Sequence, residues 1–253
     1  MKTIILIAVR LKSSRLPKKA ISKIEDQTLI EHLIDRMKSV KNIFKVIVCT
    51  STNPQDDVLE DISRKKGIEC FRGSENNVIE RFYLASKKYN PDLIIRTTGD
   101  NCLVSTEFIE EAITKHIENK ADYTTTEKLP RGGKAEVISF STLIKLLEYS
   151  EDPNSSEYMT WFLDNPDIFR VQKLNVKPEW DRPNYRITCD TPNDLKLIKE
   201  IYSRLYKQGN IVDFSSVIKL LDNNPDLVAL NKEVKQVSKD DVGDIINYKV
   251  KKQ

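Results

Sequence analysis

The apolar run from Ile4 to Val9 is the feature that most limits how this chain can fold. It is too short for a buried helix and has no polar face, which is typical of a strand covered on both sides in a parallel sheet. The run ends at Arg10, and most residues from there to Lys19 are Lys, Ser or Arg. Because ligands of open α/β sheets bind at strand ends, we expect this cationic loop to hold an anion such as a polyphosphate. A solvated basic turn is the plainer alternative.

Short apolar runs and helically spaced apolar positions alternate along the chain. This alternation predicts an α/β fold, in which a parallel sheet is covered by helices on both faces. The expected strands are 44–49, 68–71, 93–98, 122–125, 136–138, 169–176 and 185–189. The expected helices are 29–40, 53–66, 108–117, 155–163, 195–205 and 212–221. The pattern then weakens, so we expect one domain over residues 1–225 and a C-terminal extension over 226–253.

Composition argues against several classes of protein. The 253 residues include 41 basic and 38 acidic side chains, a net charge of +3, so no general attraction to nucleic acid or membranes is expected. No apolar stretch is long enough to span a membrane, and the first run is too short for a secretory signal. Cys49, Cys70, Cys102 and Cys189 form no C-x-x-C pair. With two histidines in the chain, a zinc site is not expected, and the cysteine pattern fits a reducing cytoplasm.

Two aspartates follow predicted strands and could hold a metal ion. Asp100 comes after Gly99 at the end of one strand, and Asp190 follows another. If both strands run parallel in one sheet, both carboxylates reach the edge that carries the cationic loop. Mg²⁺ is usually held by one or two carboxylates together with substrate phosphates, so a magnesium site is expected there. Each aspartate could instead support the start of the helix that follows it. Asp100 lies too early in the chain for this role, and Thr191 to Asp194 already supply a cap for the helix after Asp190.

Three segments together resemble a known enzyme family. Arg10 to Lys19 resembles the motif Ala-Arg, spacer, Ser, one residue, Arg-Leu-Pro-Gly-Lys of the cytidylyltransferases that activate sugars for surface polysaccharides. The resemblance is to the spore coat polysaccharide biosynthesis protein F group in particular, and the enzymes that activate ulosonic acids such as Kdo and sialic acids are more distant. Arg72 to Arg81 is similar to the family's Arg-Gly-Ser-Glu segment, and Arg186 to Asp190 to its Arg-x-Thr-x-Asp.

The resemblance implies roles for individual residues. The catalytic residues it implies are Arg15, Lys19 and Asp100. The nucleotide-binding residues it implies are Ala8, Arg10, Ser13, Arg15, Lys19, Arg72, Gly73, Ser74, Arg81 and Asp100. The acceptor-binding residues it implies are Arg131, Glu136, Glu157 and Arg186, and the metal ligands are Asp100 and Asp190. The chain departs from the family pattern at Lys18, where glycine is usual, and at Cys102, Ser105 and Tyr158.

The fold implied by the resemblance is a Rossmann-like nucleotidyltransferase fold with a mostly parallel central sheet. The implied activity is transfer of CMP from CTP to a sugar or sugar acid, with Mg²⁺ as cofactor and release of pyrophosphate, in cytoplasmic synthesis of surface glycans. A homodimer through residues 169–176 is expected by analogy. The sequence has no Walker A motif and no Gly-x-Gly-x-x-Gly, which argues against a P-loop kinase or a dehydrogenase. Two alternatives stay open: a non-catalytic sugar-nucleotide binding protein, and a transferase with another nucleoside triphosphate or a phosphorylated or non-sugar acceptor.

Overall fold

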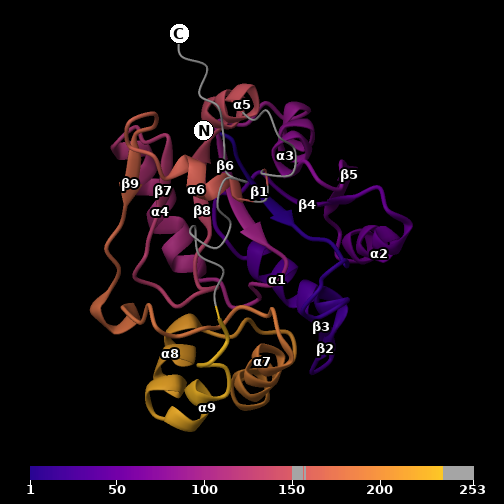
Figure 1. The fold of residues 1–253 in the computed structure, drawn as a ribbon, viewed down its shortest axis with the longest axis vertical. Helices are drawn as coiled ribbons and strands as arrows, with labels where there is room; N and C mark the ends of the chain where they lie inside the picture. The colour runs from indigo at the N-terminus through magenta and orange to yellow at the C-terminus, as the bar shows by residue number, and fades with distance from the viewer. Residues whose placement is uncertain (150–155, 157, 236–253) are drawn as a thin grey trace.

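Parallel strands form the centre of the molecule (Figure 1). The computed structural model describes residues 1–149, 156 and 158–235. In this part of the chain one sheet has seven strands in the order β5-β4-β1-β6-β8-β7-β9, and β8 alone runs antiparallel to its neighbours. The strands are β1 (Thr3–Ala8), β4 (Lys45–Ser51), β5 (Glu69–Gly73), β6 (Leu93–Thr98), β7 (Tyr123–Thr125), β8 (Glu136–Ser139) and β9 (Val171–Lys173). A separate hairpin joins β2 (Lys23–Ile24) to β3 (Gln27–Thr28).

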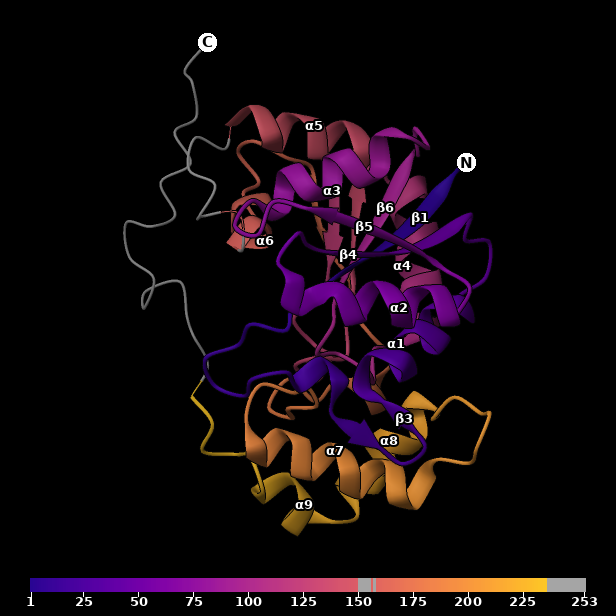
Figure 2. The same ribbon diagram turned by 90° about the vertical axis from the view of Figure 1, so that its right-hand side faces the viewer.

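Helices cover both faces of this sheet (Figure 2). The helices on one face are α3 (Val78–Lys87), α5 (Phe140–Tyr149) and α6 (Met159–Leu163). The helices on the other face are α1 (Leu29–Lys38), α2 (Asp57–Lys65) and α4 (Thr106–Glu118). A further layer beyond the carboxyl edge of the strands consists of α7 (Pro192–Leu205), α8 (Phe214–Asp222) and α9 (Pro225–Ala229). The described residues also include the short 3-10 helices η1 (Lys19–Ile21), η2 (Pro54–Asp56) and η4 (Pro178–Trp180).

The side chains of β1 alternate between two separate cores. Ile5 and Ile7 pack with α1 and α4, whereas Ile4 and Leu6 pack with α3 and α5. All four are fully buried. A strand covered on both faces needs apolar residues at successive positions, which is why the first run of the sequence has no polar face. The predicted sheet, mostly parallel and covered on both sides, is confirmed.

The strand expected at residues 185–189 is not part of the sheet. This segment makes an isolated parallel bridge between Arg186 and Arg131 instead. The backbones approach so closely there that a Cβ on Gly132, whose φ is 93°, would lie 2.6 Å from the main-chain nitrogen of Thr188. The N–H of Cys189 donates to the main-chain oxygen of Asp100 at 3.0 Å. The segment therefore crosses the carboxyl ends of the strands, with its backbone bonded to two loops.

Helix α9 begins at Pro225, where the sequence analysis placed the end of the domain. Its Leu227 is buried in the same core as α7 and α8, and Asn231 beyond it is also buried. The chain therefore stays packed on the main body past the expected boundary, and the part of the expected extension after residue 235 lies outside the described residues. None of the helices in the described ranges combines the length and the apolar character of a bilayer-spanning segment.

Candidate active site

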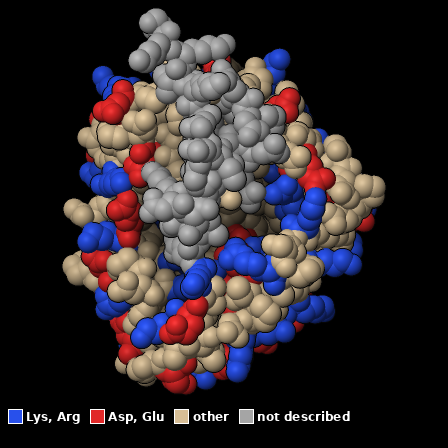
Figure 3. All heavy atoms as spheres, in the orientation of Figure 1, with Lys and Arg blue, Asp and Glu red and all other residues tan. Residues whose placement is uncertain are grey.

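A cleft of about 1060 Å³ opens at the carboxyl ends of β1 and β6. Its walls include the cationic loop after β1, the turn after β6, and parts of the segments 123–136 and 183–190. In Figure 3, Lys and Arg atoms gather near the middle of the face shown, with acidic atoms among them. The residues predicted for the site that line the cleft are Ala8, Arg10, Ser13, Arg15, Lys19, Arg81, Asp100, Arg131, Glu136 and Asp190.

The ammonium group of Lys19 joins the two predicted aspartates. Its Nζ donates to Oδ2 of Asp100 and to Oδ1 of Asp190, each at 2.7 Å. A guanidinium nitrogen of Arg15 lies 3.1 Å from the same oxygen of Asp190. The side chains of Lys19, Asp100 and Asp190 are 15%, 19% and 8% exposed, so these charges interact with little screening by water. Two carboxylates and two cations thus meet at one point of the cleft.

Burial and charge act in opposite directions on this cluster. Burial alone would raise the pKa of the Asp190 carboxyl, but the charges of Lys19, Arg15 and Arg186 hold it well below its usual range. Burial likewise disfavours the charged form of Lys19, but its two carboxylate partners outweigh burial and raise its pKa. At neutral pH both groups are therefore ionised, as a site for a polyanion and a cation requires.

Asp100 reaches the cleft because two strand ends approach each other closely. A Cβ on Gly99 would lie 2.5 Å from a side-chain carbon of Val9, so only glycine fits beside the end of β1. The hydroxyl of Thr98 donates to Oδ1 of Asp100 at 2.5 Å and holds that oxygen, while Oδ2 faces Lys19. Ser105 caps α4 through the N–H of Phe108, at 3.1 Å. Helix capping therefore accounts for Ser105, at the position where the family often has aspartate. Because Ser105 caps α4, Asp100 is not needed as the cap, and its carboxylate can face the cleft.

A buried carboxylate anchors the cationic loop. Asp56 is fully buried and accepts hydrogen bonds from the N–H of Leu11 at 2.8 Å and from the hydroxyl of Ser51 at 2.5 Å. It therefore ties the loop after β1 to the end of β4. No local pattern in the sequence indicates this contact, because Leu11 lies 45 residues before Asp56 in the chain.

Replacing Asp56 with Asn should lower the free energy of unfolding by about 2–3 kcal/mol, because an amide NH₂ would face buried donors that then lose an acceptor. Asp57→Asn is the matched control, since the Asp57 side chain is 62% exposed and pairs with Arg72 at the surface. Its effect should stay below about 1 kcal/mol. Urea denaturation of the two variants measures the difference, and equal losses would contradict the anchoring role.

The residue that replaces the family's glycine has a strained backbone. Lys18 adopts φ 58° and ψ 21°, a left-handed conformation that favours glycine. Residues with a Cβ lose roughly 1–2 kcal/mol there, whereas glycine loses roughly 0.5–1 kcal/mol more chain entropy on folding. Lys18→Gly should therefore raise the free energy of unfolding by about 0.5–1 kcal/mol and leave the contacts of Lys19 in place. Denaturant unfolding measures the change, and a loss of stability would show that the turn is not strained.

Arg186 lies behind the cleft wall and is not among the residues that line it. It is 8% exposed, and its guanidinium donates to Asp194 at 2.8 and 3.0 Å and to Asp190 at 2.7 Å. Arg186 was predicted to bind the acceptor, whereas its Nε and one terminal nitrogen donate to these two carboxylates. The predicted helix cap is confirmed, because Thr191 and Asp194 form a capping box at the start of α7. Asp194 therefore serves both the helix cap and the ion pair.

Further cations from β6 and the 126–134 loop line the cleft. Arg131 is half-buried, and its guanidinium has no hydrogen-bonding or ion-pair partner in the described part of the chain. Burial and the nearby Arg186 lower the pKa of Arg131. Arg96 pairs with Glu136 at 3.1 Å, in the register where β6 faces β8. Lys134 lines the cleft too, and it donates only to neutral oxygens, at 2.8 and 2.9 Å.

Arg96 and Lys134 were missed by the sequence analysis. A signal existed for the first, since an arginine inside an otherwise apolar strand needs a special partner. Lys134 lies between Arg131 and Glu136, both of which were predicted to bind the acceptor. Because neither residue belongs to a motif that the sequence analysis recognised, only their positions in the cleft identify them.

The turn after β5 is held by two arginines of the cleft. Arg10 donates to the main-chain oxygen of Glu75 at 2.7 Å, and Arg81 donates to that of Ser74 at 2.7 Å. Arg72, Gly73 and Ser74 do not line the cleft. Arg72 bonds to the main-chain oxygens of residues 51 and 53 and to two acidic groups of α2 instead.

Glu157, predicted to bind the acceptor, lies outside the described residues. Tyr158, which stands where the family has histidine, lines the cleft and stacks on Trp161 at 4.8 Å between ring centroids. The side of the cleft that α6 forms therefore offers aromatic surface in addition to charge.

The donor set suits a hard divalent cation held partly by substrate. No group of three or more His, Cys, Asp or Glu side chains in the described ranges is arranged to hold a metal. Asp100 and Asp190 instead share one cation, the ammonium of Lys19. Two carboxylates completed by phosphate oxygens and water are a usual ligand set for Mg²⁺. The residues present therefore fit magnesium bound together with a polyphosphate.

Comparisons with known proteins identify the family. The cytidylyltransferase family model matches residues 4–220. An uncharacterized protein of Methanocaldococcus jannaschii is 35% identical over 241 residues, which cover 94% of this chain and 98% of that protein. Spore coat polysaccharide biosynthesis protein SpsF of Bacillus subtilis is 32% identical over 227 residues, which cover 87% and 94%.

Among solved structures, a cytidylyltransferase from Leptospira borgpetersenii serovar Hardjo-bovis matches with a TM-score of 0.84 and 28% identity, over 94% of this chain and 99% of that one. The expected Rossmann-like nucleotidyltransferase fold and the expected family are both confirmed. On its sequence and its fold, this chain belongs to the cytidylyltransferase family.

Proposed function

We propose that this protein transfers CMP from CTP to a sugar or sugar-acid acceptor and releases pyrophosphate, as a step in surface glycan synthesis. The observation that carries the proposal is the meeting of Lys19, Asp100 and Asp190 in the cleft, beside Arg15. An oxygen of the acceptor attacks the α-phosphorus of CTP. The bond from that phosphorus to the oxygen bridging toward the β-phosphate breaks, and the acceptor proton leaves to water.

The residues of the cleft meet what this chemistry needs, which is positioning and neutralised charge more than a covalent nucleophile. Arg10, Arg15 and Lys19 come from one loop and would neutralise the triphosphate. Arg131, whose guanidinium has no partner in the described ranges, would bind an anionic or hydroxyl group of the acceptor. Asp100 and Asp190 would hold Mg²⁺, which when bound supplies further neutralisation of the phosphates.

The decisive experiment is an assay of pyrophosphate release with CTP, Mg²⁺ and a panel of sugar acids and neutral sugars. Mass spectrometry should identify a CMP-linked product. Parallel reactions with ATP, GTP and UTP test the preference for cytosine. Thermal stabilisation by CTP without pyrophosphate release from any acceptor would instead support a non-catalytic sugar-nucleotide binding protein.

We also propose a cytoplasmic homodimer. Cys49, Cys70, Cys102 and Cys189 are all free thiols, which suits a reducing compartment. Strand β9 is the last strand of the sheet in the described part of the chain and lies within the region expected to form the dimer, and an edge strand can pair with a second chain. Light scattering after size-exclusion chromatography tests the dimer, and a monomer at micromolar concentration would contradict it.

A further inference from the structure

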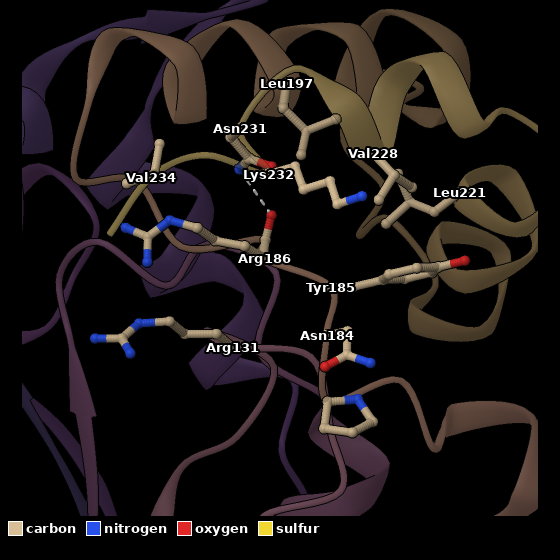
Figure 4. A pocket seen from close by; sticks show the side chains of 11 residues that line it. Arg131, Asn184, Tyr185, Arg186, Leu197, Leu221, Val228, Asn231, Lys232 and Val234 are labelled. Atoms are coloured by element: carbon tan, nitrogen blue, oxygen red, sulfur yellow. Dashed lines mark hydrogen bonds between the residues drawn. The ribbon is translucent and has the colours of Figure 1, made fainter. Parts of the chain in front are cut away.

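A buried hydrogen-bonded network connects the chain after α9 to Asp190. The side-chain amide of Asn231, which is 3% exposed, donates to the main-chain oxygen of Arg186 at 3.0 Å and to Oδ1 of Asp194 at 2.8 Å. Figure 4 shows Asn231 next to Arg186, with the first of these bonds dashed. Asp194 binds the guanidinium of Arg186, which in turn donates to Asp190. Both hydrogens of the Asn231 amide are therefore used to hold the residues behind Asp190.

This network determines which oxygen of Asp190 faces the cleft. Oδ2 accepts from Arg186 at 2.7 Å, and Oδ1 is left to Lys19 and Arg15. Asp194 also neutralises the guanidinium of Arg186. Without it, the full charge of Arg186 would act on Asp190 and weaken the attraction of its carboxylate for a cation.

Asn231 belongs to a segment that also forms one wall of a cavity of about 230 Å³. In Figure 4 the side chains of Arg131 and Arg186 extend to the same side, away from the wall formed by Leu221 and Val228. The segment therefore packs against the backbone that carries these two arginines. The guanidinium of Arg186 pairs with Asp190 and Asp194, and Arg131 lines the cleft.

We propose that Asn231 is a positioning residue for the cation site. Its amide holds the Arg186–Asp194 pair, and that pair keeps Asp190 in the orientation that binds a divalent cation. This inference rests on the proposed function, because it requires a cation at Asp100 and Asp190. It also extends the functional unit of the chain past residue 225, into a segment that the sequence analysis assigned to an extension.

The test uses the full chain with Mn²⁺ as the probe cation and CTP present. Free Mn²⁺ is followed by electron paramagnetic resonance and compared with a titration of CTP alone, because CTP itself binds Mn²⁺. Asn231→Ala should weaken Mn²⁺ binding roughly tenfold, since loss of a group that orients a metal ligand typically costs 10–100-fold in affinity. The Mg²⁺ concentration for half-maximal pyrophosphate release should rise by a similar factor, while the KM for CTP at saturating Mg²⁺ changes by less than about twofold. Asn231→Ser, which keeps one donor, should give an intermediate shift.

The matched control is Asn224→Ala, which removes a side-chain bond to the main-chain oxygen of Leu220 in the same layer of helices but touches no residue of the network. The Asn224→Ala variant should bind Mn²⁺ as tightly as wild type, even if its thermal stability falls as much as that of Asn231→Ala. Equal Mn²⁺ affinity in wild type and both Asn231 variants would overturn this inference and leave the proposed function intact. A wild-type protein that binds no Mn²⁺ with CTP would overturn the metal assignment, and this inference with it.

Discussion

Replacing Asp100 with Asn should lower kcat on the order of a thousandfold, because the cation site would lose one of its two carboxylates. Asn keeps the shape of the side chain and an oxygen for the hydroxyl of Thr98, so the fold should be preserved. The affinity for CTP should not fall. Removal of a negative charge beside Arg15 and Lys19 makes the loop more attractive to a triphosphate. The expected signature is a loss in kcat with an unchanged or lower dissociation constant for CTP.

Steady-state pyrophosphate release and calorimetric titration with CTP measure the two quantities. Asp92→Asn is the matched control, since Asp92 precedes the amino end of β6, where its carboxylate accepts from the N–H of Lys2 at 2.6 Å. This variant should keep its turnover within about twofold of wild type. If Asp100→Asn retained near-normal turnover, Asp100 would not be a ligand of the essential cation.

Lys19→Met should lower kcat/KM for CTP roughly a hundredfold to a thousandfold, comparable to the loss of a donor that faces developing charge. In contrast to Asp100→Asn, this change should weaken CTP binding, because it removes a positive charge from the loop. Binding of Mn²⁺ without nucleotide should not weaken, since the ammonium group that Asp100 and Asp190 share would be gone. The pKa of Asp190 should rise, because Lys19 is the largest of the charges that lower it.

The control for this variant is Lys18→Met. Lys18 is exposed and does not line the cleft, and methionine keeps the same left-handed backbone requirement as lysine. Its kcat/KM should stay within about threefold of wild type, as an exposed charge near the site acts through screened attraction only. Similar losses in the two variants would mean that the loop acts through its net charge, and that the contact of Lys19 with the two carboxylates is not essential.

Local patterns predicted most of the secondary structure, because the features that encode it lie within a few residues of each other. The apolar run of β1 reflects burial on both faces, and Thr191 with Asp194 forms the expected capping box of α7. Asp100 follows β6 as expected. The direction of that one strand was therefore enough to predict that Asp100 lies at the carboxyl edge of the sheet. These inferences required no knowledge of which distant segments meet.

The predictions that depended on long-range pairing were less accurate. The segment 185–189 has the composition of a strand, but its hydrogen-bonding groups are bonded to the loops at Arg131 and Asp100. Arg186 was predicted to bind the acceptor, and the structure shows its buried guanidinium paired with Asp190 and Asp194, which supply the compensating charge that burial requires. Asp56 resembled an ordinary first-turn acid, and nothing near it in the sequence indicates the contact with Leu11.

The order of residues is enough to predict an α/β sheet covered on both faces and a cationic loop at the end of its first strand. The reason is that hydrophobic period and capping preference are local properties of a chain. The folded molecule was needed to show that Lys19 meets Asp190, 171 residues away, and that Asn231 is hydrogen-bonded to the Arg186–Asp194 pair beside that aspartate. Such contacts depend on how strands and loops pack in space, and packing is a property of the whole molecule that no local pattern encodes.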